Sequence, residues 1–255
     1  MNAKKTIIRI GRNTLSFTTL DASSTEHKIL YRPYVVRGGI SMSANLREAF
    51  RTGDYLDNEV TKVQILVEAP SLLVPIEQFD EAEKEALYSY SYPAGQEKRV
   101  IFHDVLPDLK AVCLYAINKN IDTVIRDRFE NGVSFAHAMT PVWRQMHQRS
   151  YTGHRNKLYG YLHNKQLEIF SFQKNRFKFC NSFDAANAHD ALYYLLYVWK
   201  QLRLEHEHDE LHILGDIPEE EWLLKELKRF LQNAYVIKTE KGMPYDLTTL
   251  ITHGR

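Results

Sequence analysis

The sequence predicts a mixed α/β fold built from two halves that open with the same order of elements. Short stretches rich in branched and aromatic residues alternate with segments of helical period, and each half starts with three strand-like stretches and a helix. The composition, 44% hydrophobic and 25% charged over 255 residues, is typical of a globular chain. This length suits one large domain or two modest ones. We place the boundary between the halves 1–153 and 154–255.

In the first half, the three opening strands and a helix are followed by a strand, a helix, two strands, a helix, a strand and a last helix. Asp80 and Glu83 form a capping-box pattern at the start of the second helix. Thr140 is the expected N-cap of the last helix and Pro141 its first residue. The predicted strands are 6–10, 14–20, 28–36, 61–68, 100–105, 109–117 and 133–138, and the predicted helices are 43–50, 80–90, 121–129 and the segment from Thr140.

The second half predicts a three-stranded antiparallel meander followed by alternating helices and strands. The strands 158–162, 167–172 and 176–182 are separated by Asn164-Lys165 and Lys174-Asn175, which suit tight turns. Asp184 is the expected cap of a buried helix whose apolar positions include Leu195 and Trp199. A strand over 210–215, a helix opened by Pro218 and three glutamates, and a strand over 235–238 complete this half.

Cysteine usage and hydropathy indicate a cytoplasmic protein without membrane insertion. Cys113 and Cys180 have no second sulfur or histidine at ligand spacing, so we expect two buried thiols rather than a disulfide or a zinc site. The chain enters its first strand directly after Lys5, without the apolar core of a signal peptide. No stretch approaches the ~18 apolar residues that a membrane helix needs.

Several catalytic chemistries lack their motifs. The chain has no phosphate-binding P-loop, no Gly-x-Ser-x-Gly elbow and no His-Glu-x-x-His helix. Nucleases of the two-metal class need carboxylates on the first strand, whereas the stretches 6–10 and 158–162 contain none. The cluster 206–212, His-Glu-His-Asp-Glu-Leu-His, is interpreted as a solvated polar loop rather than a metal site. We therefore expect no metal site, and the balance favours a protein that is not an enzyme.

Charge is segregated along the second half although the formal net charge is only +1. Residues 131–183 hold eight basic residues and one acidic residue, while residues 184–226 hold eleven acidic and three basic residues. One interpretation is that the two blocks neutralise each other in the folded protein. The other is that the basic segment 144–178 faces RNA or another anionic partner. We favour the first, because surfaces that bind phosphates usually carry more positive charge.

The doubled order of elements resembles the actin-like ATPase fold, in which two ribonuclease-H-like halves face a cleft. Three stretches are also similar to an uncharacterised bacterial family assigned to that fold: residues 38–46 (Gly-Gly-Ile-Ser-Met-Ser-Ala-Asn-Leu), residues 72–75 (Leu-Leu-Val-Pro) and the turn Leu214-Gly215. The resemblance covers nearly the whole chain. It implies a fold, two ribonuclease-H-like halves with the order β-β-β-α-β-α, and carries no established activity.

The resemblance also locates where a nucleotide would bind. In nucleotide-binding members of the superfamily, the hairpin after the first strand of each half carries an aspartate beside glycines, because amides cradle phosphate while the carboxylate positions magnesium. The first hairpin here contains Gly11, Arg12 and Asn13 and no acid, and the second, 159–165, contains no aspartate. Of the paired glycines that pack against adenosine, Gly215 alone is present. ATP hydrolysis is therefore not expected, and Gly11, Arg12, Asn13 and Gly215 are the candidate cofactor-binding residues.

Two functions remain open. The first is a non-catalytic actin-like scaffold, without a cofactor, that binds a protein partner or a second copy of itself. The alternative is a protein that binds ATP, another nucleotide or a phosphorylated ligand in the cleft between its halves, with weak or no ATPase activity. Stabilisation by added nucleotide separates the two, because a ligand that binds only the native state raises its stability.

Overall fold

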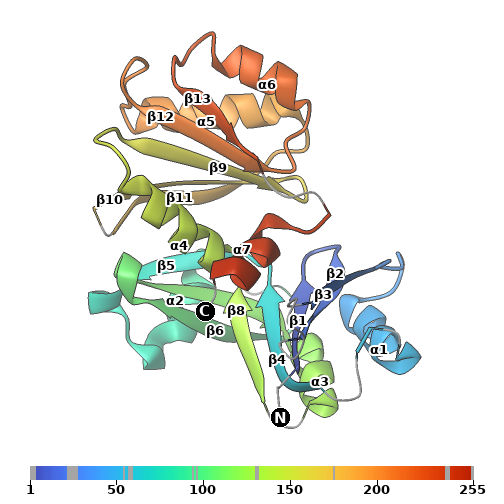
Figure 1. Cartoon of the computed structure of the whole chain (residues 1–255). Coiled ribbons are helices and arrows are strands. Elements are labelled where there is room, and N and C mark those ends of the chain that lie inside the picture. Colours follow the sequence, from blue (N-terminus) through green and yellow to red (C-terminus); the bar gives the residue numbers. More distant parts are fainter. Residues whose placement is uncertain are drawn as a thin grey trace. The chain divides into compact units, whose positions relative to one another are not determined.

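A computed structural model shows that the protein is a mixed α/β fold (Figure 1). The chain divides into two compact units, residues 1–107 with 111–140, and residues 108–110 with 141–255. The predicted boundary at 153/154, as the limit between two ribonuclease-H-like halves, stays a prediction. The structure describes residues 4–21, 28–53, 55–56, 60–93, 95, 97–129, 132–174, 176–238 and 242–253.

The N-terminal unit contains a five-stranded sheet in the order β3-β2-β1-β4-β8. Three strands form an antiparallel meander, and β4 and β8 continue parallel to β1. Helices α1 (Met42–Thr52) and α3 (Lys119–Arg128) contact each other, and Phe50 of α1 packs edge-on against Phe17 of β2. The strands are β1 (Lys4–Ile10), β2 (Leu15–Asp21), β3 (Lys28–Tyr34), β4 (Val60–Val67) and β8 (Val133–His137).

A second, three-stranded sheet of this unit has the order β5-β7-β6 and is covered by α2 (Lys84–Ser91). Its strands are β5 (Ser71–Pro75), β6 (Arg99–Leu106) and β7 (Ala111–Asn118). Tyr88 of α2 is buried, and its hydroxyl donates a hydrogen bond to the Pro70 carbonyl oxygen at 2.8 Å. Burial raises the pKa of Tyr88 to about 12, so the phenol stays a donor at neutral pH.

The C-terminal unit repeats the arrangement of the first sheet, with the order β11-β10-β9-β12-β13. Here too, three antiparallel strands are followed by two strands parallel to the first of them. The strands are β9 (Lys157–His163), β10 (Gln166–Gln173), β11 (Arg176–Asp184), β12 (Glu210–Gly215) and β13 (Ala234–Ile237). The helices are α4 (Met139–Ser150), α5 (Ala188–Gln201), α6 (Glu220–Leu227) and α7 (Tyr245–His253). Helix α4 begins in the N-terminal unit.

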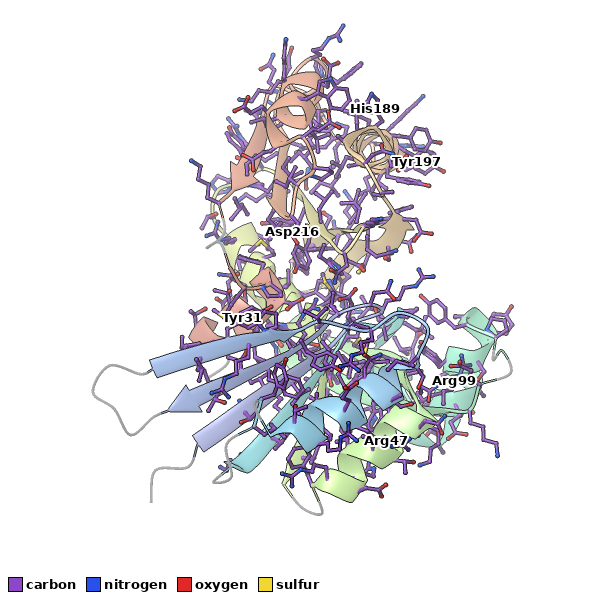
Figure 2. The ribbon with its side chains drawn as sticks, turned by 90° about the vertical axis from the view of Figure 1, so that its right-hand side faces the viewer. Tyr31, Arg47, Arg99, His189, Tyr197 and Asp216 are labelled. Carbon is purple, nitrogen blue, oxygen red and sulfur yellow. The ribbon has the colours of Figure 1, made fainter. Side chains whose placement is uncertain are left out.

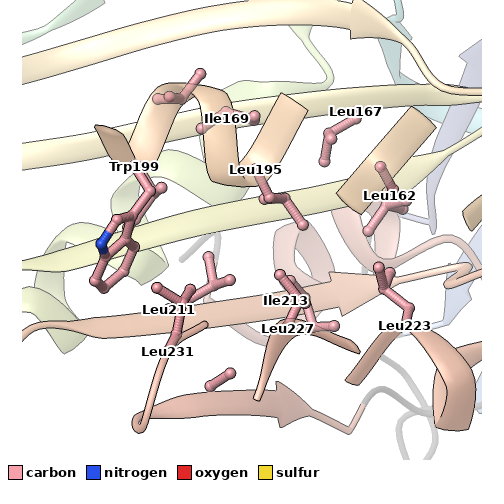
Figure 3. Packing of buried hydrophobic residues seen from close by; sticks show 14 of the residues in the cluster. Leu162, Leu167, Ile169, Leu195, Trp199, Leu211, Ile213, Leu223, Leu227 and Leu231 are labelled. Atoms are coloured by element: carbon pink, nitrogen blue, oxygen red, sulfur yellow. The ribbon is translucent and has the colours of Figure 1, made fainter. Parts of the chain in front are cut away.

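One face of this sheet packs against α5 and α6 to form the main core of the unit (Figure 3). The predicted core residues Leu195 and Trp199 are buried, at 0% and 5% exposure, as expected, whereas Tyr193 and Tyr197 leave one face of the helix exposed. Gly160 of β9 lies beneath α5, and a Cβ atom on it would approach Leu195 Cδ2 to 2.8 Å. The absence of a side chain at residue 160 therefore allows α5 to lie close to the sheet.

Some predicted details were wrong. Asp184 does not cap α5 but ends β11, where its carboxylate accepts a hydrogen bond from Gln166. The cap is Asn187, whose side chain accepts from the Asp190 amide at 3.0 Å, because β11 extends as far as β10 offers partners. Cys113 is buried as expected, whereas Cys180 on the edge strand is only partly buried.

Two elements were not predicted, the strand β5 and the helix α7. Among the described residues, no helix is long and apolar enough to cross a membrane.

Candidate functional site

The carboxyl ends of the parallel strands are where ligands usually bind in open α/β sheets. In the N-terminal unit these are the ends of β1, β4 and β8, and in the C-terminal unit those of β9, β12 and β13. Gly11, Arg12 and Asn13 follow β1, and Gly215 ends β12. The candidate residues from the sequence therefore lie at these two edges, which we call the N-terminal edge and the C-terminal edge.

A buried ion pair fills the N-terminal edge beside Gly11. The guanidinium of Arg9 donates to Glu68 Oε2 at 2.8 Å and to Thr14 Oγ1 at 3.2 Å. The two charged side chains are only 3% and 12% exposed. A Cβ atom on Gly11 would approach Thr14 Oγ1 to 2.3 Å and Glu68 Oε2 to 2.7 Å. Gly11 is thus enclosed by polar side chains of its own unit, while Arg12 and Asn13 are exposed at the turn.

Sequence reasoning found no acid in this hairpin, but the fold brings one to it from a distance. Glu68 follows β4, and its backbone N–H donates to the Ile10 carbonyl oxygen at 2.9 Å. Its carboxylate, however, already faces the Arg9 guanidinium. A carboxylate that holds magnesium presents its oxygens to the ion. Here the Arg9 guanidinium occupies the position beside the carboxylate that the ion would take.

A second carboxylate at the N-terminal edge is also committed to the fold. Asp104 of β6 accepts hydrogen bonds from the His137 amide at 2.7 Å, from Thr140 Oγ1 at 2.8 Å and from the Tyr115 hydroxyl at 3.1 Å. Burial and the charge of Asp104 raise the pKa of Tyr115, which keeps the phenol protonated as a donor. This carboxylate links β6, β7, β8 and the start of α4.

The start of α4 differs from the prediction for that reason. The helix begins at Met139 rather than after a Thr140 cap, so Thr140 lies in the first turn. Its hydroxyl donates to Asp104, and the Met139 amide faces His137 Nδ1 at 3.3 Å. Thr140 is therefore bonded to Asp104 of β6 instead of capping the helix, and the His137 ring accepts from the first amide of α4.

The C-terminal edge turns at Gly215, where the backbone requires glycine. Gly215 has a φ of 94°, and a Cβ atom on it would lie 2.1 Å from the Leu162 carbonyl oxygen and 2.8 Å from the Tyr161 ring. The next amide, of Asp216, donates to that same carbonyl at 2.7 Å. The close approach of this turn to β9 explains the glycine in the Leu214-Gly215 motif.

An open cavity of about 570 Å³ lies at the C-terminal edge. This volume falls in the range of small-molecule sites. Its polar lining comes from the ends of β9, β12 and β13 and the starts of α6 and α7: Tyr161, Asp216, Glu220, Lys238 and Tyr245. Figure 2 shows Asp216 within the C-terminal unit. The sequence pointed to this place through Gly215, but not to the aromatic residues that line it.

The charge of this cavity limits what it can hold. Among the described residues that line it, Asp216 and Glu220 contribute two carboxylates and Lys238 one ammonium. The Tyr161 hydroxyl donates to the buried Asp246 at 3.3 Å, and the Tyr245 hydroxyl, whose pKa burial raises, donates to Gln145. The two phenol oxygens therefore face the cavity as acceptors. Carboxylates and phenols bind hydroxyl and amine groups, whereas a phosphate would meet excess negative charge. The cavity is therefore suited to a neutral or cationic ligand.

No group of three or more His, Cys, Asp or Glu side chains among the described residues could hold a metal ion. The cluster 206–212 divides in two. His206 is exposed beside Glu207, as expected of a loop, whereas His212 lies in β12 and pairs with Glu210 at 2.9 Å. Residues 210–212 begin β12, which confirms the predicted strand over 210–215, and the loop is limited to the residues before it.

The basic segment distributes its charges among separate partners. Arg144 pairs with Asp108 at 3.4 Å, and Arg155 pairs with Glu210 of the acidic block at 3.8 Å. Lys157 is buried, and its ammonium donates to the Arg149 carbonyl oxygen at 3.0 Å and to Thr152 Oγ1 at 2.8 Å. Lys157 thus binds the carboxyl end of α4, where a positive charge is stabilising. These contacts agree with partial neutralisation within the fold.

The architecture described above is that of an actin-like ATPase fold. A Bacteroides thetaiotaomicron protein with this fold and unknown function superposes with a TM-score of 0.87 at 25% identity, over 98% of this chain and 96% of that one. The chain belongs to the family described as "Protein of unknown function (DUF3822)", whose model matches residues 1–234. No curated protein matches the sequence.

More distant structures share the fold alone. The cytoplasmic domain of EpsL, an inner membrane component of the type II secretion system of Vibrio cholerae, has a TM-score of 0.50 at 11% identity, over 99% of this chain and 94% of that one. A chain of the PilM–PilN type IV pilus biogenesis complex has a TM-score of 0.53 at 12% identity, over 93% and 89%.

Proposed function

We propose that this protein is a cytoplasmic, non-catalytic actin-like scaffold that binds a protein partner or a second copy of itself. The observation that carries the proposal is the Arg9–Glu68 pair beside Gly11. Magnesium-dependent phosphoryl transfer needs carboxylates that face the ion and glycine amides that face the phosphates. At the N-terminal edge, a guanidinium faces the carboxylate and a threonine hydroxyl closes on the glycine.

The fold comparisons support a role in assembly. The PilM–PilN structure is a complex of two proteins, and EpsL is a component of a secretion system. Both similarities rest on fold alone, and one fold hosts many functions. They make a protein partner a reasonable first candidate for this chain.

The proposal is tested by measuring phosphate release from ATP with and without magnesium. We expect no magnesium-dependent release above buffer for the wild-type chain, and the same result for Arg12→Ala, which removes the exposed guanidinium of the hairpin. Lys200→Ala, at an exposed position on α5, is the matched control. A magnesium-dependent rate that Arg12→Ala abolishes and Lys200→Ala preserves would contradict the scaffold.

Self-association is tested separately by sedimentation over a wide concentration range. A mass that rises with concentration identifies a second copy as a partner. A monomer mass that stays constant with concentration leaves a different protein as the partner that the proposal requires.

A second candidate function is favoured by the cavity at the C-terminal edge. We infer that this cavity could hold a nucleoside-like ligand, since its carboxylates and phenols suit hydroxyl and amine groups better than phosphates. Thermal-shift measurements with adenosine, ADP and ATP at millimolar concentration test it. A stabilisation that follows adenosine ≥ ADP ≥ ATP, and that Asp216→Asn weakens, supports ligand binding. No shift with any of the three supports the scaffold without a ligand.

A further inference from the structure

The loop 35–41, between β3 and α1, is held in place by one buried amide side chain. Asn45 of α1 is 0% exposed. Its side-chain oxygen accepts a hydrogen bond from the Arg37 amide at 2.8 Å, and its Nδ2 lies 3.1 Å from the Ser41 carbonyl oxygen and 3.3 Å from that of Arg37. These bonds fix residues 37–41 of the loop to the first turn of α1. The loop therefore has a defined conformation before any partner binds.

The fixed loop presents aliphatic side chains to the surface. Val35 is 85% exposed and Ile40 is 46% exposed. Between them, Gly38 and Gly39 have open space where a Cβ atom would be. Two exposed aliphatic side chains on a rigid loop cost little ordering entropy when a partner covers them, which is the physical basis of a pre-organised contact.

Three exposed arginines lie on the loop and on α1: Arg37, Arg47 and Arg51. Helix α1 contains one acidic residue. That acid, Glu48, is already paired with Arg37 at 2.8 Å and faces the Tyr34 hydroxyl at 3.4 Å. Arg47 and Arg51 are exposed on α1 four positions apart, so they lie about 6 Å apart along the helix axis (Figure 2, where α1 faces the viewer and Arg47 is labelled).

We propose that the surface formed by Val35, Arg37, Ile40, Arg47 and Arg51, here called the α1 surface, binds an extended acidic segment of a partner protein. This inference rests on the proposed scaffold function and names the chemistry of the partner. Aliphatic side chains of the segment would contact Val35 and Ile40, and its carboxylates would pair with Arg47 and Arg51. Helix α1, with 11 residues, is about 16 Å long, which an extended peptide of about five residues spans.

The composition of the α1 surface favours a peptide over other polyanions. The guanidinium fork matches a carboxylate with two parallel hydrogen bonds, and four of the five basic residues in 28–53 are arginine. Single-stranded RNA would require exposed aromatic faces for its bases, but the two apolar side chains that the loop presents are aliphatic. A lipid surface is usually bound by an amphipathic helix with several large apolar side chains on its buried face.

The test selects ligands from a library of random dodecapeptides displayed on phage, using the whole chain as bait. We expect selected peptides to be enriched in Asp and Glu around one or two aliphatic residues. Synthetic copies are then titrated by fluorescence anisotropy against the wild-type chain, Val35→Asp/Ile40→Asp and Arg47→Glu/Arg51→Glu. Each double variant should weaken binding at least ~10-fold. Affinity should also fall as salt rises from about 50 to about 300 mM.

Two control variants make the test specific. Val105→Asp changes an exposed aliphatic residue on β6 (46% exposed) and Lys200→Glu an exposed cation on α5, and both should leave affinity within about twofold. The positions changed in the two double variants and the two controls are exposed, so the circular dichroism spectra and melting temperatures of these four variants should stay at wild-type values. Asn45→Ala, which releases the loop, should weaken binding although it changes none of the contacting side chains.

Several results would overturn the proposal. These are an empty selection, selected peptides without acidic residues, peptides that bind the α1 variants as tightly as the wild type, and tighter binding of poly-U RNA or phosphatidylserine vesicles than of any selected peptide. Phosphate release from ATP reports on the scaffold proposal independently. If the chain hydrolyses ATP and still binds acidic peptides at the α1 surface, the scaffold proposal is wrong and the peptide-binding proposal stands. If the chain does not hydrolyse ATP and binds no acidic peptide, the scaffold proposal stands and the peptide-binding proposal is wrong.

Discussion

The N-terminal and C-terminal edges arise from sheets with the same order of strand directions, yet they present different surfaces. At the first, Arg9 and Glu68 close on Gly11 and leave the polar groups paired with one another. At the second, Gly215 turns tightly against β9 and a cavity of about 570 Å³ remains beside it. The comparison shows that topology places an edge where a ligand can bind, and that a few side chains decide whether space is left there.

The largest expected effect comes from removing the cation of the N-terminal edge. Arg9→Met leaves the Glu68 carboxylate, 12% exposed, without the guanidinium 2.8 Å away, and should lower the free energy of unfolding by about 3 to 5 kcal/mol. Urea unfolding measures it. In the double variant Arg9→Met/Glu68→Met the loss should shrink to about 1 kcal/mol, because neither charge remains.

The exposed pair Arg229–Glu226 is the matched control, with a similar distance of 2.7 Å but an arginine that is 67% exposed. Arg229→Met should cost less than about 0.5 kcal/mol. Equal costs for Arg9→Met and Arg229→Met would mean that the ion pair does not fill the N-terminal edge in solution.

The two edge glycines should respond differently to a methyl group. Gly215→Ala places Cβ 2.1 Å from a backbone carbonyl oxygen at a φ of 94°, so it should destabilise by about 3 kcal/mol or more. Gly11→Ala meets the ends of side chains, which can shift, and should cost about 1 to 2 kcal/mol. Thermal and urea unfolding of both variants give the ranking.

Gly38→Ala is the control for these substitutions, since a Cβ atom there meets nothing within 4 Å. It should leave stability unchanged or raise it by about 0.5 kcal/mol. If Gly11→Ala lowers the free energy of unfolding more than Gly215→Ala does, our description is wrong, because it places the backbone clash at the C-terminal edge.

The smallest effect is a pH dependence in the C-terminal sheet. Burial lowers the pKa of His212 from 6.5, although its hydrogen bond to Glu210 acts in the opposite direction. The unfolded chain therefore binds this proton more readily, so stability is complete above about pH 6.5 and falls as pH drops towards the folded pKa. His212→Asn should flatten the decline in melting temperature between about pH 7.5 and 5. If the slope of melting temperature against pH is the same in His212→Asn, His212 does not cause the pH dependence.

Local patterns predicted much of the fold because the relevant forces are local. Stretches rich in branched and aromatic residues, separated by turn residues, identified the meander 158–182, and helical spacing identified Leu195 and Trp199 as core. Helix starts were less predictable. Asp184 and Thr140 are good capping residues, but strand pairing with β10 and the distant carboxylate of Asp104 determined where α5 and α4 begin.

The site residues were the least predictable part. Glu68 reaches Gly11 only because β4 pairs with β1 in parallel, a contact between residues almost sixty positions apart. The cavity lining includes Tyr245, the first residue of α7, a helix that the sequence analysis did not identify. Gly11, Arg12, Asn13 and Gly215 as cofactor-binding residues remain a prediction, and the structure adds Tyr161, Asp216 and Tyr245 to the positions that deserve substitution.

From the absence of a side chain at Gly160 we also predict how related sequences vary. Because a Cβ atom there would approach Leu195 Cδ2 to 2.8 Å, the volumes of residues 160 and 195 are linked across the helix–sheet contact. A homologue with alanine at position 160 should carry a smaller residue than leucine at 195, and homologues with leucine at 195 should keep the glycine. The two positions should therefore vary together, although they lie 35 residues apart in the chain.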